Sequence, residues 1–261
     1  FEGTLIGGFS FFASNTLSSM AGININWLIL AIGGMILIWV LTYFDITVAA
    51  AVLGVTLVGE VLLLAAFGIS VLFKGGPDGF MVSETIAPMA AFADLEAGAF
   101  GSSVAAGTAA LGIFFAFWSW IGFETTAAYG EESKDPKHVV PRATMIAVIG
   151  LGVFYTFVSW MAVVANGAKT SVEVSSGSTG NPVDLWLVPV QANLGTFAES
   201  SYRVLLVIGS FACAMAFHNA ASRYVFALGR ELPFAGIRTR LSSTHHKHQS
   251  PAVASSVVTA I

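Results

Sequence analysis

Long apolar segments are the feature that most limits what this chain can fold into. A helix needs roughly 20 apolar residues to cross about 30 Å of hydrocarbon, and several segments approach or exceed that length. They lie at residues 3–21, 27–43, 46–73, 108–129, 143–165 and 202–228, with a further one at 251–261. Because lipid offers no partners to backbone polar groups, such segments are expected to be helices. The sequence therefore predicts an all-α, polytopic membrane protein, with residues 1–261 in a single transmembrane domain.

Composition supports a lipid bilayer as the main surrounding of this chain. Hydrophobic residues make up 56% and charged residues 10%, whereas a soluble domain is about 25% charged. The formal net charge is −4, with 11 Lys and Arg against 15 Asp and Glu. Phosphate backbones require a basic surface, so we expect no nucleic-acid partner.

The loops differ in charge, which predicts their sides of the membrane. Basic residues gather in loops 131–142 and 229–250, namely Lys134, Lys137, Arg142, Arg230, Arg238, Arg240 and Lys247. Loops 74–107 and 166–201 hold only Lys74 and Lys169. By the positive-inside rule, the basic loops are cytoplasmic and the other two are external. We expect a bacterial inner membrane, and a cytoplasmic turn that contains Pro136 and Pro141.

Both ends of the chain lie inside predicted helices. Phe1 follows no initiator methionine, and the segment from Pro251 stops at Ile261, after too few residues to cross a bilayer. We therefore expect the chain to be a fragment of a longer protein.

Glu60 lies near the middle of the apolar segment 46–73. A charged carboxylate at that depth costs about 2.5–3.5 kcal/mol on insertion scales, so it must face protein or a wet cavity. Intramembrane carboxylates are often proton carriers, and we predict a coupling role for Glu60. The alternative is a protonated side chain that hydrogen-bonds a neighbouring helix.

A dense aromatic run with interspersed small residues occupies the segment 108–129. Gly122 is a poor helix former, so a helix break at residues 119–122 is feasible. Unwound backbone is tolerated at membrane depth where it lines a cavity, and its carbonyls suit an ammonium group. Aromatic faces attract the same cation. The candidate substrate-binding residues are Phe117, Trp118, Ser119, Trp120, Ile121 and Gly122. The alternative is ordinary helix packing with tryptophans at the membrane interface.

Two other polar residues within apolar segments have two interpretations each. Glu124 is a candidate for gating or proton linkage, or it bridges helices through hydrogen bonds. His218 is more simply a hydrogen-bond donor in helix packing than a proton relay.

Two motifs resemble those of the amino acid-polyamine-organocation superfamily. The first continues from the aromatic run through Gly122-Phe123-Glu124, Glu131-Glu132, Asp135-Pro136 and Pro141-Arg142-Ala143. The second is the stretch 219–233, NAASRYVFALGRELP, followed by His248-Gln249-Ser250-Pro251. They are similar to the family's sixth segment, its eighth segment with the following loop, and the start of its ninth.

The resemblance implies a five-plus-five inverted-repeat transporter fold, of which this chain covers segments three to the start of nine. In that fold, discontinuous first and sixth helices hold the substrate at the midplane. By likeness, backbone near Trp118 and Ile121 takes the substrate amino group and Trp118 is an aromatic gate, while Ser119 and Gly122 permit the break. By the same likeness, Glu60 occupies the position where some proton-coupled members have a lysine. Because a carboxylate and an ammonium group differ in charge, the role of that lysine does not carry over to Glu60.

The function implied by the resemblance is secondary active transport of an amino acid or related amine. Proton symport or substrate exchange with alternating access would drive it. The alternative is an amino acid or amine sensor on a transporter-like scaffold. An enzyme is disfavoured, because the apolar segments contain no nucleophile–base pair or HExxH motif.

We expect no cofactor and no metal site. The tract containing His245, His246 and His248 has no supporting carboxylate or cysteine for a closed metal site. The single cysteine, Cys213, excludes an intrachain disulfide.

Overall fold

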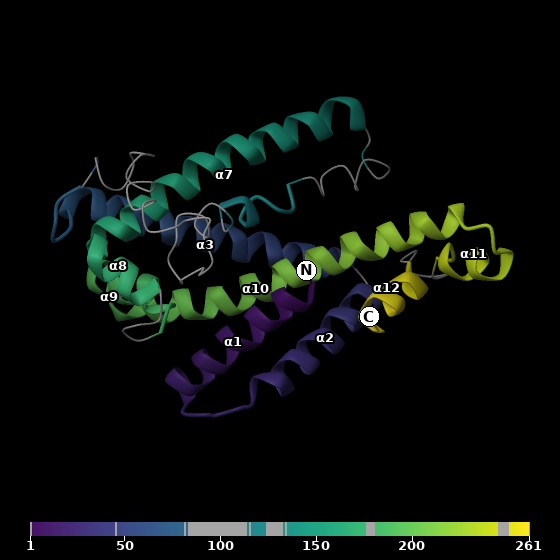
Figure 1. Ribbon diagram of the computed structural model, residues 1–261, viewed down its shortest axis with the longest axis horizontal. Coiled ribbons are helices and arrows are strands. Elements are labelled where there is room, and N and C mark those ends of the chain that lie inside the picture. The colour runs from purple at the N-terminus through teal and green to yellow at the C-terminus, as the bar shows by residue number, and fades with distance from the viewer. Residues whose placement is uncertain are drawn as a thin grey trace, which may run out of the picture. The chain divides into compact units, whose positions relative to one another are not determined.

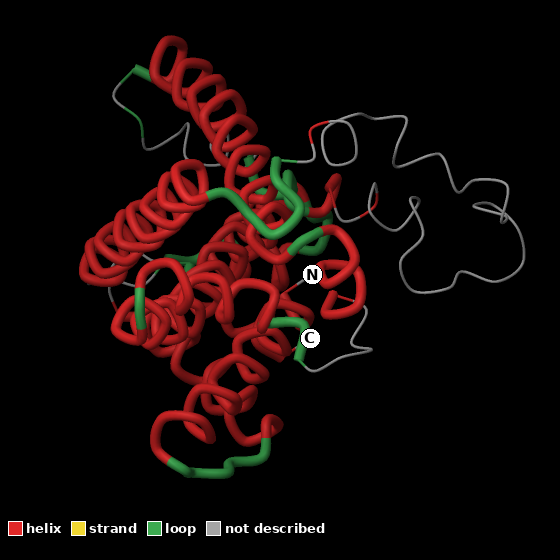
Figure 2. Tube along the Cα trace, turned by 90° about the vertical axis from the view of Figure 1, so that its left-hand side faces the viewer, coloured by secondary structure: helices red, strands yellow, loops and turns green. Residues whose placement is uncertain are grey.

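The computed structural model describes residues 2–44, 46–80, 82, 114, 116–123, 133, 135–175, 181–244 and 251–260. Its helices are α1 (Glu2–Ala21), α2 (Trp27–Phe44), α3 (Ile46–Lys74), α7 (Pro136–Asn166), α8 (Ala168–Ser175), α9 (Asp184–Leu194), α10 (Thr196–Glu231), α11 (Ala235–Leu241) and α12 (Ala252–Ala260) (Figure 1). Figure 2 shows helices joined by loops, and none of the described residues forms a strand. The predicted all-α fold class is confirmed.

Three of the described helices are long and apolar enough to cross a membrane. They cover Gly54–Lys74, Pro136–Asn166 and Thr196–Glu231, and Trp27–Thr42 is a shorter apolar helix. Most residues in these helices are not buried inside the protein, and large apolar side chains such as Phe73, Ile146 and Phe197 are exposed. A soluble protein does not tolerate so much exposed apolar surface, whereas lipid solvates it.

The chain divides into two compact units. Unit 1 comprises residues 1–61 and 200–261, and unit 2 comprises residues 62–199. The boundaries between them fall within α3 and α10.

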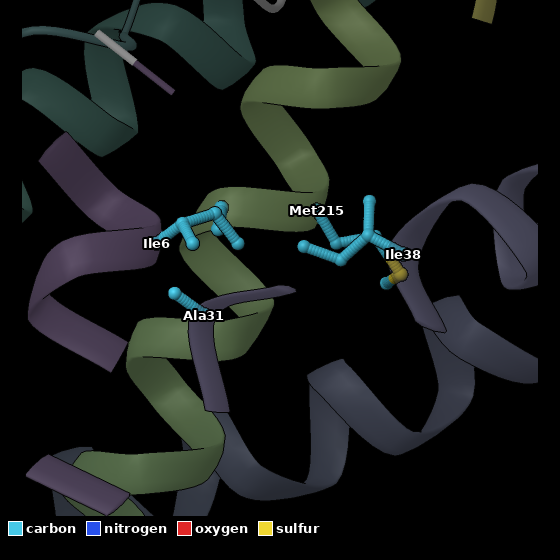
Figure 3. Packing of buried hydrophobic residues seen from close by; sticks show 5 residues of the cluster. Ile6, Ala31, Ile38 and Met215 are labelled. Atoms are coloured by element: carbon cyan, nitrogen blue, oxygen red, sulfur yellow. The ribbon is translucent and has the colours of Figure 1, made fainter. Parts of the chain in front are cut away.

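In unit 1, α1 and α2 form an antiparallel pair, and α12 packs on α2 (Figure 1). The α2 N-terminus is capped by Asn26, whose side-chain oxygen accepts the Leu28 N–H at 2.9 Å. The hydrophobic core brings together apolar side chains of α1, α2 and α10 (Figure 3), namely Ile6, Ala31, Ile38, Ala214 and Met215. Burial of this cluster fixes the faces that α1 and α10 present to each other.

In unit 2, α7 packs against α8 and α9. Both α8 and α9 lie within residues 166–201, so part of the predicted external loop is helical. Asn166 at the end of α7 donates a side-chain hydrogen bond to the Leu185 carbonyl of α9 at 2.9 Å. Lys74 at the end of α3 donates to the Asn193 carbonyl, also at 2.9 Å. These contacts hold the ends of three helices together.

The start of α7 differs from the predicted turn. Asp135 occupies the N-cap, Pro136 begins the helix, and Pro141 lies inside it. Proline suits the first helical position because the N–H it lacks has no intrahelical acceptor there. The prediction of a turn at Pro141 was wrong, because the helix tolerates a proline near its N-terminus.

Candidate functional site

A helix ends in a turn in the aromatic segment of unit 2. Residues 116–118 are helical, and residues 119–123 form a turn. The Trp120 N–H donates to the Phe117 carbonyl and the Ile121 N–H to the Trp118 carbonyl, each at 3.1 Å. These hydrogen bonds span three residues rather than the four of an α-helix. The Ser119 hydroxyl donates to the Ala116 carbonyl at 2.8 Å, which closes the same turn with a side chain.

Gly122 permits the backbone geometry of this turn. Its φ is +116°, in a region that residues with a side chain rarely adopt and that glycine enters freely. The predicted break falls at residues 119–122, where the structure has this turn after the helical residues 116–118.

The predicted substrate-binding residues are contiguous, with Phe117 and Trp118 at the end of the helix and residues 119–122 in the turn, but their environments differ. Phe117 is 73% exposed, and Ile121 is also exposed, while Trp118 and Trp120 are partly buried. The ring centroids of Phe114 and Trp118 lie 5.8 Å apart. This arrangement presents aromatic surface directly beside the irregular backbone.

Trp120 packs against α7 at a glycine. A Cβ atom added at Gly152 would lie 2.9 Å from Trp120 Cη2, closer than ordinary contacts allow. The indole therefore occupies space that any side chain at position 152 would fill. Close approach at a glycine is a common way for membrane helices to pack.

Glu60 belongs to unit 1, where its carboxylate faces the backbone of α10. A Cβ atom added at Gly209 would overlap Glu60 Oε1. Tyr202, Gly209 and Cys213 follow at intervals of seven and four residues, so they lie on one face of α10. The Glu60 carboxylate lies against this face at Gly209. Glu60 therefore points into the protein and not only toward lipid.

One carboxylate oxygen of Glu60 has unused hydrogen-bonding capacity. Oε1 is buried and makes no hydrogen bond with the part of the chain that the structure describes. Buried polar atoms are nearly always hydrogen-bonded, so this oxygen is an exception. The alternative predicted for Glu60, a hydrogen bond to a neighbouring helix, is not seen for this oxygen among the described residues.

Another polar group in unit 1 is assembled by residues far apart in the chain. Nδ1 of His218 lies 2.7 Å from Glu2 Oε1, and Nε2 lies 2.9 Å from Ser255 Oγ. The sequence singles out His218 as a polar residue in an apolar segment. It gives no sign that α1 and α12 supply the partners, because 216 and 37 residues separate them from it.

Some of the predicted residues lie outside the described part of the chain. These are Glu124, for which gating and helix bridging remain the two interpretations, and the histidines 245, 246 and 248.

A comparison with known proteins gives the family of this chain. The family model described as amino acid permease matches residues 3–261. No curated protein matches the sequence at a significant level. The family match covers nearly all of the sequence, and three described helices are long and apolar enough to cross a membrane. The chain therefore belongs to the amino acid permease family, a family of integral, multi-pass membrane transporters for amino acids or related amines and not of enzymes.

Proposed function

We propose that this chain carries the substrate site and a coupling residue of a secondary active transporter, which works by alternating access. The substrate ammonium group binds at residues 117–122, and Glu60 links transport to a proton gradient or to substrate exchange. The observation that carries the proposal is the helix break at Ser119–Phe123, with Gly122 at φ +116°. Irregular backbone at membrane depth is typical of transporter binding sites.

The chemistry of the turn suits a primary ammonium group. The carbonyl oxygens of Phe117 and Trp118 accept three-residue hydrogen bonds, and backbone carbonyl oxygens in irregular segments suit an ammonium group. The aromatic faces of Phe114 and Trp118 lie beside them and attract a cation through their negative π surface. Trp118 acts as an aromatic gate that closes over the bound amine.

The chemistry of Glu60 suits coupling. A buried carboxylate oxygen without a protein partner can take a proton and release it when the protein changes conformation. Its contact with the backbone at Gly209 makes the α3–α10 interface sensitive to the protonation state. Protonation removes the charge, whereas an ionised Glu60 draws water or a cation to that interface.

The proposed membrane is a bacterial inner membrane, with the basic loops 131–142 and 229–250 on the cytoplasmic side. The excess of Lys and Arg in those loops supports this orientation.

The experiment is uptake of radiolabelled amino acids and polyamines by proteoliposomes that contain the complete protein, with and without an imposed pH gradient. Wild type is compared with Glu60→Gln, which retains the shape of the side chain but cannot ionise. We expect uptake of at least one compound, driven by the gradient in wild type and independent of the gradient in Glu60→Gln.

The matched control is Glu173→Gln in α8, where the carboxylate is exposed and lies 3.9 Å from the Lys169 ammonium. This variant should transport as wild type does. Equal pH dependence in wild type and Glu60→Gln would contradict the coupling role. Binding of a panel compound without any uptake would contradict transport and favour the sensor.

A further inference from the structure

The segment that follows α10 folds back against the end of that helix, apart from the substrate site and from Glu60. After α10 ends at Glu231, three residues lead into the short helix α11. A Cβ atom added at Gly229 would lie 2.6 Å from Leu241 Cβ, so the end of α11 lies against the last turn of α10 (Figure 1). The small residue Gly229 therefore allows α11 to lie beside the end of a helix long enough to cross a membrane.

Large apolar side chains are exposed around this junction. Leu228 in α10 and Phe234 just before α11 are each 65% exposed, and Ile237 in α11 is 51% exposed. Water does not favour such a grouping on one short segment, whereas the boundary between lipid headgroups and acyl chains accepts it. These three side chains therefore indicate that α11 lies at the level of the bilayer surface.

Two arginines flank the apolar side of α11. Ile237 and Leu241 are four residues apart, so they lie on one face of the helix. Arg238 lies about 100° from Ile237 in one direction, and Arg240 lies about 60° from it in the other. Both arginines are exposed. This arrangement is typical of an interfacial helix, whose apolar side chains enter the bilayer while its arginines reach the headgroups.

A third arginine extends the basic surface onto α10. The Arg230 guanidinium carbon lies 4.5 Å from the centroid of the Phe226 ring, which comes one helical turn earlier. Stacking of this kind holds a guanidinium by its face, whereas its N–H groups donate hydrogen bonds in the plane. Glu231 is the single acid among the described residues 228–244. The segment therefore presents an excess of positive charge.

We propose that α11 and the end of α10 form a docking site for anionic phospholipids. Arg230, Arg238 and Arg240 bind the headgroup phosphates, because a planar guanidinium donates two parallel hydrogen bonds to such a group. Phe234 and Ile237 insert beside the acyl chains. Zwitterionic lipids carry the same phosphate, but their ammonium group cancels its charge. The excess of arginine therefore selects lipids with a net negative charge.

The test is fluorescence of the complete protein in nanodiscs, with one copy in each disc and a polarity-sensitive dye attached to Ile237→Cys. Other reactive cysteines, including Cys213, are replaced by serine. The discs contain phosphatidylcholine and a rising fraction of phosphatidylglycerol. We expect the dye emission to move to shorter wavelength as phosphatidylglycerol is added, because the apolar side of α11 then enters lipid.

Removal of the two arginine charges should weaken this response. Arg238→Gln/Arg240→Gln should raise the phosphatidylglycerol fraction that gives half of the shift about fivefold or more, since each basic residue near an anionic surface contributes about fivefold in affinity. Arg238→Lys/Arg240→Lys keeps both charges and should retain most of the shift. The control is Lys169→Gln in α8, which removes an exposed positive charge from unit 2 and should leave the titration unchanged.

Two further conditions need no charge variant, and so test the proposal even if such a variant does not fold. Salt at about 0.5 M should reduce the shift, because it screens exposed charges. Inorganic phosphate added to discs of pure phosphatidylcholine should cause no shift, because it has no acyl chains. A second copy of the chain is excluded as the occupant, since each disc holds one.

An emission that does not change with phosphatidylglycerol would overturn the proposal, whether the dye reports water or lipid throughout. A dye that reports water in every disc would instead favour a protein as the partner of α11. A shift that Arg238→Gln/Arg240→Gln leaves unchanged would also overturn it. Because no uptake is measured, the result is independent of the proposed transport function.

Discussion

The aromatic turn of unit 2 and the partly buried acids of unit 1 are exceptional in opposite ways. At residues 119–123 the backbone is irregular, with Gly122 at φ +116°, while neighbouring side chains such as Phe117 and Phe123 are ordinary exposed aromatics. Around Glu60 and Glu2 the backbone is regular helix, and the side chains are exceptional. The turn offers carbonyl oxygens and aromatic faces, whereas the acids offer carboxylate oxygens.

Because of this difference, different substitutions are informative in each region. In the turn, replacing a glycine changes the geometry of the proposed substrate site. Beside the partly buried acids, replacing a glycine changes packing, and an amide in place of an acid changes charge. Glycine variants in the two regions should therefore fail in different assays, and the three below are ordered by expected effect.

The largest effect is expected for Gly122→Ala. A side chain at φ +116° costs about 1–3 kcal/mol of backbone strain, which the turn can relieve only by changing shape. We expect initial uptake to fall about tenfold or more. The control is Gly150→Ala, because Gly150 lies in α7 with nothing within 4 Å of an added Cβ. Normal uptake by Gly122→Ala would show that the turn does not form the substrate site.

The next effect is expected for Gly209→Ala. The added methyl group would collide with the Glu60 carboxylate, and overpacking of this kind costs about 1–3 kcal/mol. We expect a lower thermal unfolding temperature and uptake reduced about fivefold, both restored by Glu60→Ala in the same chain. Gly54→Ala in α3, where the added Cβ meets open space, is the control. Failure of the double variant to recover would place the damage elsewhere than at Glu60.

The smallest effect is expected for Gly152→Ala. The new Cβ would press on the Trp120 indole, which is a side chain and can shift more easily than backbone. We expect the KM for uptake to rise about two- to fivefold with little change in stability, as for a misplaced binding group. The same Gly150→Ala control applies. A fall in stability with an unchanged KM would assign Trp120 to packing alone.

The fold class followed from the sequence, because a run of about 20 apolar residues has few options other than a helix in lipid. The position of the turn at residues 119–123 agrees with the sequence for a similar reason, since glycine weakens a helix wherever it lies. The start of α7 was not predicted from the sequence, because a proline usually indicates a turn, although a helix accepts it near its N-terminus. The helices within residues 166–201 were not predicted either, because their contacts with the end of α7 involve single side chains such as Asn166.

The sequence alone therefore predicted local features: apolar helices, irregular backbone at residues 119–122, a family resemblance that the match over residues 3–261 confirmed, and an acid, Glu60, within an apolar segment. The packing of the helices decided which polar groups meet. It placed Glu60 against Gly209 and brought Glu2 and Ser255 to the two nitrogens of His218. The physical reason is that the pattern of apolar residues along the chain indicates where a helix begins and ends. Hydrogen bonds between helices depend instead on how the helices pack, and packing brings together residues that lie far apart in the sequence.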